Sequence, residues 1–215
     1  SAIFVLLYPH FRQFIDNVTE SVFSRSHYNY SDILRSFESL LSTSMTLDEW
    51  YRLLAQGFKD HLKLSSVAIY RQDGSQFKSV SSLGSVNPVP EYILPKDPLI
   101  CYLSDYSDLV LLDDLMQDQL EDEYYLRGLQ HSFQWSLLLP LYHNNELEGF
   151  IILGEKRSQA HFSMPDIRLI NTLWHQVTSN YYHVSHYDSL NNSVDNLFYL
   201  SQSMLEINLS DTIHD

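Results

Sequence analysis

The sequence predicts an α+β domain in which helices at both ends flank a central antiparallel sheet of about five to six strands. Two observations lead to this prediction. Apolar residues three and four apart, typical of helices, occupy both ends of the chain, and two short hairpin patterns lie between them. The 215 residues are 44% hydrophobic and include only 6 Gly and 7 Pro, so the chain can bury a sizeable core.

Three helices are expected before the sheet. Apolar residues spaced three and four apart predict helices over 11–22 and 33–41. A third helix is expected to begin at Thr46, because Glu49 follows three residues later and the two can cap the free amides of the first turn.

The first hairpin is expected next. Period-two alternation predicts a strand over 67–70 and its partner over 77–83, joined at Asp73-Gly74. The proline-rich stretch 84–98 is expected to be a loop that crosses the sheet.

Two helices with a strand between them are expected after the loop. A short helix over 99–104, a buried strand over 109–112 and a helix over 118–127 are expected, with the last ending near Gly128.

The second hairpin and a long helix complete the domain. Strands over 136–142 and 148–155 are expected to flank a turn at Asn144-Asn145. Gly149 and Gly154 suggest close backbone approaches in the second strand.

The final helix is expected to begin at Ser163, with Pro165 in its first turn and Asp166 three residues after the cap. Its helical spacing continues to residue 207.

Composition excludes several functions. Lys and Arg number 13 against 27 Asp and Glu, and the net charge of −14 disfavours nucleic-acid binding. The lone Cys101 excludes an internal disulfide, a four-cysteine zinc site and a two-cysteine redox cycle. No run reaches the roughly 18–20 apolar residues of a membrane span. The apolar run Ser1–Tyr8 is either a frayed end or the last turn of a membrane helix.

Three segments together resemble a GAF domain of a bacterial signalling protein over residues 30–182. They are TLDEWYRLLAQGFKDHLKLSSVAIYR (46–71), WSLLLPLYHNNELEGFIILGEK (135–156) and FSMPDIRLINTLWHQVTSNYYHV (162–184). The preceding stretch, residues 8–30, resembles the segment that joins the last membrane helix to the GAF domain in membrane-bound sensor histidine kinases. Asp16, Phe23, Arg25 and Tyr30 match that pattern, whereas His27 and Asn29 depart from it.

The resemblance implies a small-molecule pocket between the sheet and the crossing loop. Its expected lining is Tyr70, Cys101, Tyr102, Leu111, Leu126 and Trp135. These side chains would serve equally well as core residues. The resemblance does not identify a ligand, because GAF domains bind cyclic nucleotides, tetrapyrroles or small metabolites, or nothing.

The sequence lacks the motifs that accompany known GAF-domain ligands and activities. A bilin-binding domain would have His after its cysteine, but Cys101 is followed by Tyr102. Cyclic-nucleotide domains have Lys where Glu146 stands and Glu where Ile167 stands. Free methionine sulfoxide reductase, an enzyme of this fold, needs several cysteines.

No cofactor and no metal are expected. His183 and His186 can share one helical face, but the sequence indicates no third metal ligand.

The expected organisation is a juxtamembrane helix (1–29), a GAF sensor domain (30–183) and a signalling helix (184–215). His214-Asp215 resembles the start of a phosphoacceptor box, with His214 as the phosphorylated residue. The resemblance thus implies a non-enzymatic, homodimeric input region of a sensor histidine kinase at the cytoplasmic face of the membrane, whose parent acts on a response regulator.

Three alternatives remain open. The domain could be a linker without a ligand, or it could regulate a diguanylate cyclase or a transcription activator. The apolar stripes of the terminal helices could also pack on their own sheet rather than on a second chain.

Overall fold

The computed structural model describes residues 30–43, 46–85, 87–105, 108–114 and 123–213. Ser36–Asp215 forms one compact unit and Ser1–Arg35 another, so α2 (Tyr30–Thr43) begins in the first unit and ends in the second. The predicted helix at 11–22, the whole 1–29 segment and His214 lie outside the described residues.

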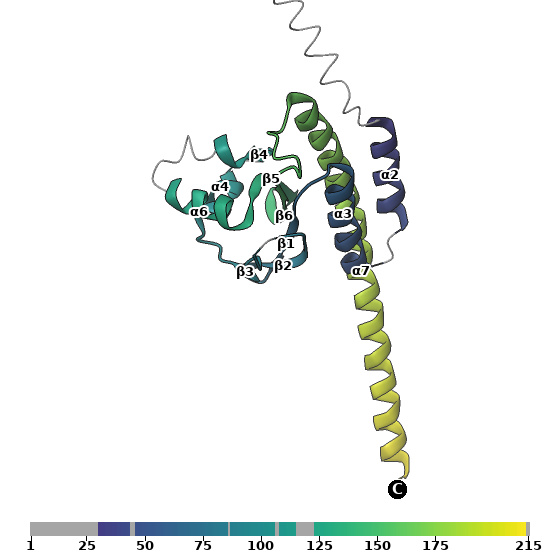
Figure 1. Cartoon of the computed structure of the whole chain (residues 1–215). Coiled ribbons are helices and arrows are strands. Elements are labelled where there is room, and N and C mark those ends of the chain that lie inside the picture. The colour runs from purple at the N-terminus through teal and green to yellow at the C-terminus, as the bar shows by residue number, and fades with distance from the viewer. Residues whose placement is uncertain (1–29, 44–45, 86, 106–107, 115–122, 214–215) are drawn as a thin grey trace, which may run out of the picture. The chain divides into compact units, whose positions relative to one another are not determined.

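A six-stranded antiparallel sheet lies at the centre of the larger unit, in the order β3-β2-β1-β6-β5-β4 (Figure 1). The predicted fold class is confirmed. The strands are β1 (Val67–Asp73), β2 (Gln76–Leu83), β3 (Tyr92–Ile93), β4 (Val110–Leu111), β5 (Trp135–His143) and β6 (Glu146–Gly154).

Both predicted hairpin turns use residues that tolerate a left-handed backbone. Gly74 has φ +62°, and Asn144 and Asn145 have φ +50° and +65°. The two successive positive φ values at Asn144 and Asn145, and the single one at Gly74, are those of tight hairpin turns whose twist matches that of the flanking strands. The turns therefore set the pairing of β1 with β2 and of β5 with β6.

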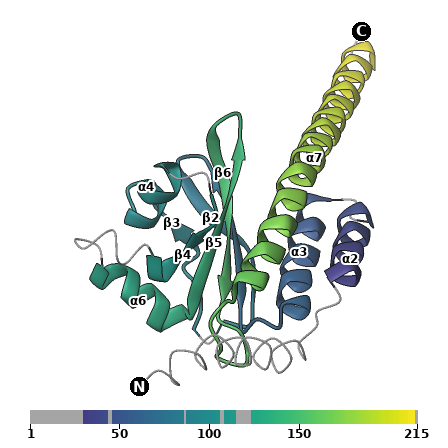
Figure 2. The same cartoon turned by 90° about the horizontal axis from the view of Figure 1, so that it is seen from above.

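Helices cover both faces of the sheet, α3 and α7 on one and α4 and α6 on the other (Figure 2). Their bounds are α3 (Leu47–His61), α4 (Pro98–Asp105), α6 (Glu123–Phe133) and α7 (Met164–Ile213). No helix among the described residues has a stretch long and apolar enough to cross a bilayer.

The expected loop over 84–98 contains the edge strand β3, so that expectation was wrong in part. Phe77 pairs with Ile93, and the backbone N–H of Ser79 donates to the carbonyl oxygen of Glu91 over 2.8 Å. Tertiary pairing thus imposes a strand on a segment that its prolines mark as irregular.

The helix expected to end near Gly128 continues to Phe133. Gly128 faces open space, and an exposed glycine costs a helix only about 1 kcal/mol. The helix ends at Gln134, which takes the left-handed conformation (φ +56°) and donates its N–H to the carbonyl of Gln130 over 2.8 Å.

The predicted cap of α7 is present, and so is the Thr46 half of the predicted cap of α3. Thr46 Oγ1 accepts from the N–H of Glu49 over 3.2 Å. At the start of α7, the Asp166 carboxylate accepts from the backbone N–H of Ser163 over 2.7 Å and from its hydroxyl. Lys156 Nζ contacts the same carboxylate, and both charged side chains are largely buried.

The ionisation of Asp166 makes the stability of the domain depend on pH. Burial alone would raise the pKa of Asp166, but the contacts from Lys156 and Ser163 lower it below its ordinary value of 3.8. A lowered folded-state pKa gives stability that is present above about pH 4 and is lost as the pH falls through the folded value.

Asp166→Asn is therefore expected to reduce the free energy of unfolding by about 2 kcal/mol at pH 7, and by clearly less at pH 3. Urea titrations at the two pH values measure this difference. Glu49→Gln, at the exposed ion pair with Arg52 (3.8 Å), is the control and should cost less than about 0.5 kcal/mol. An equal loss at both pH values for Asp166→Asn would contradict the assignment.

Candidate ligand site

The sheet face under α4 and α6 carries one continuous apolar cluster. Every strand of the sheet contributes to it, because alternate residues of a strand point to the same face. Its buried members are Ala68, Tyr70, Phe77, Ile93, Leu99, Ile100, Leu103, Val110, Leu112, Leu126, Leu129, Trp135, Leu138, Leu147, Phe150 and Ile152. This is the side of the sheet on which the sequence predicts a ligand pocket.

Tyr70 lies at the centre of this cluster. Its ring stacks on Phe150 with centroids 5.0 Å apart, and its edge meets Trp135 at 6.4 Å. Its hydroxyl donates to the carbonyl oxygen of Pro90 over 2.7 Å, which ties the crossing segment to β1. Burial raises the pKa of Tyr70, and an interaction with Ser79 offsets only part of that rise. The phenol therefore stays neutral and acts as a hydrogen-bond donor.

Two further tyrosine hydroxyls bind the ends of α4. Tyr125 donates to the Asp97 carboxylate over 2.6 Å, and the other oxygen of Asp97 caps α4 by accepting from the N–H of Leu99 over 3.0 Å. Tyr142 donates to the carbonyl oxygen of Leu103. Burial, with the nearby charge of Asp105, raises the pKa of Tyr142. Tyrosine hydroxyls from α6 and β5 thus fix the position of α4.

The predicted lining residues divide into three groups. Tyr70, Leu126 and Trp135 are fully buried members of the cluster. Tyr102 is half-buried and packs against the cluster, and Leu111 is half-buried in β4. Cys101 is exposed, and its sulfur lies 3.8 Å from the carbonyl oxygen of Pro95.

Sequence reasoning missed Phe150, Tyr142, Tyr125 and Asp97. Strand alternation in β5 places Tyr142 on the same face as Leu138, and this signal could have identified it. Asp97 directly precedes Pro98, the first residue of α4, and an Asp before a helix is a common cap.

The arrangement can hold an apolar group. The cluster is aromatic and aliphatic, and the hydroxyls of Tyr70, Tyr125 and Tyr142 beside it already donate to carbonyl or carboxylate oxygens. Among the described residues, no three His, Cys, Asp or Glu side chains are grouped so that they could hold a metal ion. A ligand at this face would be largely apolar and uncharged.

Solved structures share this fold. A GAF domain of a phosphoenolpyruvate-protein phosphotransferase from Coxiella burnetii is 16% identical, with a TM-score of 0.58 over 75% of this chain and 97% of that one. A methyl-accepting chemotaxis protein (residues 122 to 287) is 19% identical, with a TM-score of 0.55 over 69% and 96%. Free methionine-R-sulfoxide reductase from Neisseria meningitidis, in complex with its substrate, is 15% identical, with a TM-score of 0.56 over 73% and 90%.

These likenesses define the class: the chain has the GAF fold, and proteins of signalling type are among those that share it. No protein-family model matches the sequence, and no curated protein matches it.

Proposed function

We propose that this chain is a dimerising GAF relay, the input region of a membrane-bound sensor histidine kinase, and that it passes a conformational change along α7. The observation that carries the proposal is the division of α7 into a first half packed on the domain and a second half in which Leu190, Val194 and Leu197 are exposed. A helix of 50 residues is about 75 Å long, far longer than packing on this sheet requires.

The first half of α7 is fixed to the domain. Trp174 Nε1 donates to the carbonyl oxygen of Pro140 in β5 over 2.8 Å. Trp50 Nε1, from α3, donates to Asn180 Oδ1 over 2.8 Å, and the Trp50 ring lies 5.7 Å from that of Tyr181. A shift of β5 or α3 would therefore move α7 with it.

The second half of α7 exposes an apolar seam, defined here as Leu190, Val194 and Leu197. Their relative exposures are 52%, 63% and 68%. Spacings of four and three residues are those of a coiled coil, in which each apolar side chain packs between side chains of a second helix. A second copy of this chain fits the seam, because equivalent residues face each other in a parallel dimer.

Removal of the seam tests the dimer. The triple variant Leu190→Asn, Val194→Asn and Leu197→Asn is expected to be monomeric at concentrations where the wild-type chain is dimeric, with an apparent dissociation constant at least about 100-fold higher. Analytical ultracentrifugation over a concentration series measures the change.

The control keeps the seam and removes equally exposed apolar surface elsewhere. Leu94→Asn with Tyr124→Asn changes residues of 61% and 92% exposure that lie outside α7 and should leave the dimer intact. A wild-type chain that is monomeric at every concentration would overturn the relay proposal.

The kinase assignment rests on the resemblance of residues 8–30 to the segment after the last membrane helix, and on His214-Asp215. In this proposal a longer parent protein anchors the domain at the cytoplasmic face, the domain itself catalyses nothing, and His214 begins the phosphoacceptor box. Sequencing the gene beyond Asp215 tests the output. A phosphoacceptor box supports a kinase, and a diguanylate cyclase or activator sequence contradicts one.

The cluster under α4 and α6 gives a second candidate, small-molecule sensing. What favours it is the set of side chains around Tyr70 and Trp135, together with half-buried aromatic residues at the margin. A thermal-shift screen with metabolites and nucleotides tests it. A compound that raises the melting temperature of the wild type, but not of Tyr70→Phe, supports sensing, whereas no stabilisation by any compound supports a linker without a ligand.

A further inference from the structure

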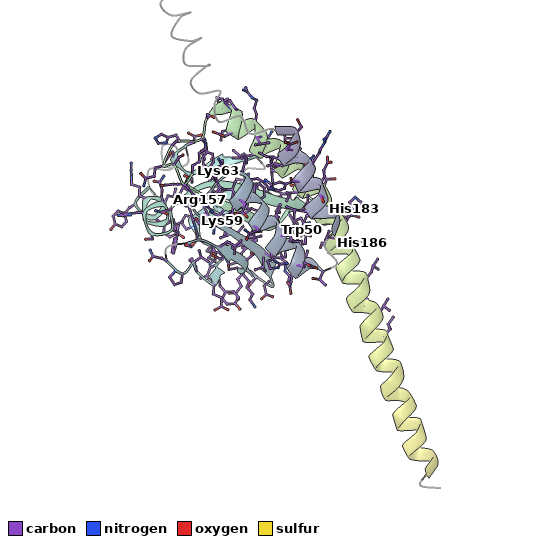
Figure 3. All side chains as sticks on the ribbon, turned by 45° about the vertical axis from the view of Figure 1, so that its right-hand side comes forward. Trp50, Lys59, Lys63, Arg157, His183 and His186 are labelled. Atoms are coloured by element: carbon purple, nitrogen blue, oxygen red, sulfur yellow. The ribbon has the colours of Figure 1, made fainter. Side chains whose placement is uncertain are left out.

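Two exposed histidines lie on α7 where the helix leaves the domain. His183 and His186 stand directly before the apolar seam, and Figure 3 labels both on this part of the helix. Residues three apart on a helix have Cβ atoms about 5–6 Å apart, so both imidazoles can reach one ion. Within the described part of a single chain they lack the third ligand that a metal centre needs.

A second copy of the chain can supply the missing ligands, because His183 lies in line with the apolar seam. His183 precedes Leu190 by seven residues, one full coiled-coil repeat, so it lies on the same helical stripe as the seam. His186 precedes Leu190 by four residues and lies beside that stripe. In a parallel dimer, both histidines of one chain therefore approach the equivalent pair of the second chain.

The domain does not occupy this stripe. Buried residues of α7 that pack on the domain include Ile170, Trp174, Val177 and Tyr181, whereas His183 and His186 are exposed. A second chain can therefore approach the histidines without displacing the domain.

An aromatic stack holds His186 at the helix surface. Its ring lies parallel to that of Tyr182, with centroids 6.1 Å apart and an interplanar angle of 2°. Tyr182 in turn stacks on His143 of β5 at 4.9 Å. This restricts the imidazole before any ion arrives, which lowers the cost of ordering it.

The charge of the helix also favours a cation. From residue 169 to residue 215 the sequence has no Lys or Arg and has five acidic residues: Asp188, Asp195, Glu206, Asp211 and Asp215. Two such helices side by side create a negative potential along their shared axis, and a divalent cation would reduce their mutual repulsion.

We propose that His183 and His186 of two chains together bind one zinc ion across the dimer formed by α7. Four neutral imidazoles match the tetrahedral preference of Zn²⁺, with Zn–N distances of about 2.0–2.1 Å. The site is complete only when a second copy is present, so this inference rests on the proposed dimer. Zinc would then strengthen the association of the two helices at the point where they leave the domains.

The test uses the full chain without a histidine tag, stripped with EDTA, and Zn²⁺ alone as the probe. We expect one zinc ion per dimer by titration calorimetry and a dimer dissociation constant at least about tenfold lower with zinc, reversed by EDTA. His183→Ala and His186→Ala should each abolish both effects. His175→Ala, an exposed histidine of the same helix eight residues before His183, is the matched control and should leave both unchanged.

The outcomes separate the two proposals. A metal-free dimer that takes up no zinc overturns the zinc site and leaves the relay intact. A chain that stays monomeric with and without zinc overturns both. Uptake of one ion per chain that persists in the monomeric seam variant overturns the shared site, as does equal loss of zinc from His175→Ala and His183→Ala.

Discussion

Trp135→Ala is expected to destabilise the domain by about 3–5 kcal/mol, because the indole is 1% exposed and its removal leaves a cavity that the surrounding side chains cannot fill. The ring stacks on Phe133 at 5.0 Å and meets the edge of Tyr70 at 6.4 Å, so both neighbours lose contacts. Urea and thermal unfolding measure the loss, expected as a fall of roughly 10 °C in melting temperature.

Two comparisons make this result specific. Trp135→Phe keeps a ring in the site and should cost clearly less than the alanine variant. Free indole at millimolar concentration should raise the melting temperature of Trp135→Ala but not of the wild type, because an apolar cavity accepts an apolar ligand of its shape. A loss below about 1 kcal/mol for Trp135→Ala would mean that the cluster around this residue is loosely packed.

Gly149→Ala is expected to cost about 3 kcal/mol or more, although it adds a single methyl group. A Cβ atom at Gly149 would stand 2.5 Å from the carbonyl oxygen of Tyr70 and 3.4 Å from the Arg71 Cα, both backbone atoms of the neighbouring strand β1. The methyl group can be accommodated only if β1 and β6 move apart, which weakens their pairing. Equilibrium denaturation measures the loss.

Gly128→Ala provides the opposite case within the same chain. A Cβ there meets nothing within 4 Å, and Gly128 lies within α6, where alanine is favoured by about 0.5–1 kcal/mol. The two glycine variants should therefore change stability in opposite directions. Losses of similar size in both would show that close strand contact is not the cause at Gly149.

Local signals account for the parts of the fold that the sequence predicts well. Thr46 caps α3 and Ser163 caps α7 because their partners lie three residues away. The two hairpins follow from turn residues that tolerate positive φ. Strand β3 was not predicted, because no local sequence signal marks it as a strand. Its backbone pairs with β2, a contact between segments that are separated in the sequence.

The candidate site was harder to predict, because its members depend on which way each side chain points. Phe150 begins the apolar run FIIL, and a continuous run does not reveal which alternate residues face which helices. Pairing with Tyr70 in β1 places Phe150 under α4 and α6. Cys101 lies outside the cluster because its neighbours Leu99, Ile100 and Leu103 form the buried side of α4.

The unbroken course of α7 has a consequence for how an input and an output can be joined. Successive residues of a helix are rotated by about 100°, so each inserted or deleted residue turns everything downstream relative to the sheet. Insertion of seven residues nearly restores the original angular phase, because it adds almost two full turns, whereas insertion of two residues turns the downstream segment to nearly the opposite side of the axis. The number of residues in α7 thus sets the angle about the helix axis between this domain and any segment that follows. A fusion made within this helix would have to keep that number, or change it by about seven, to preserve the angle.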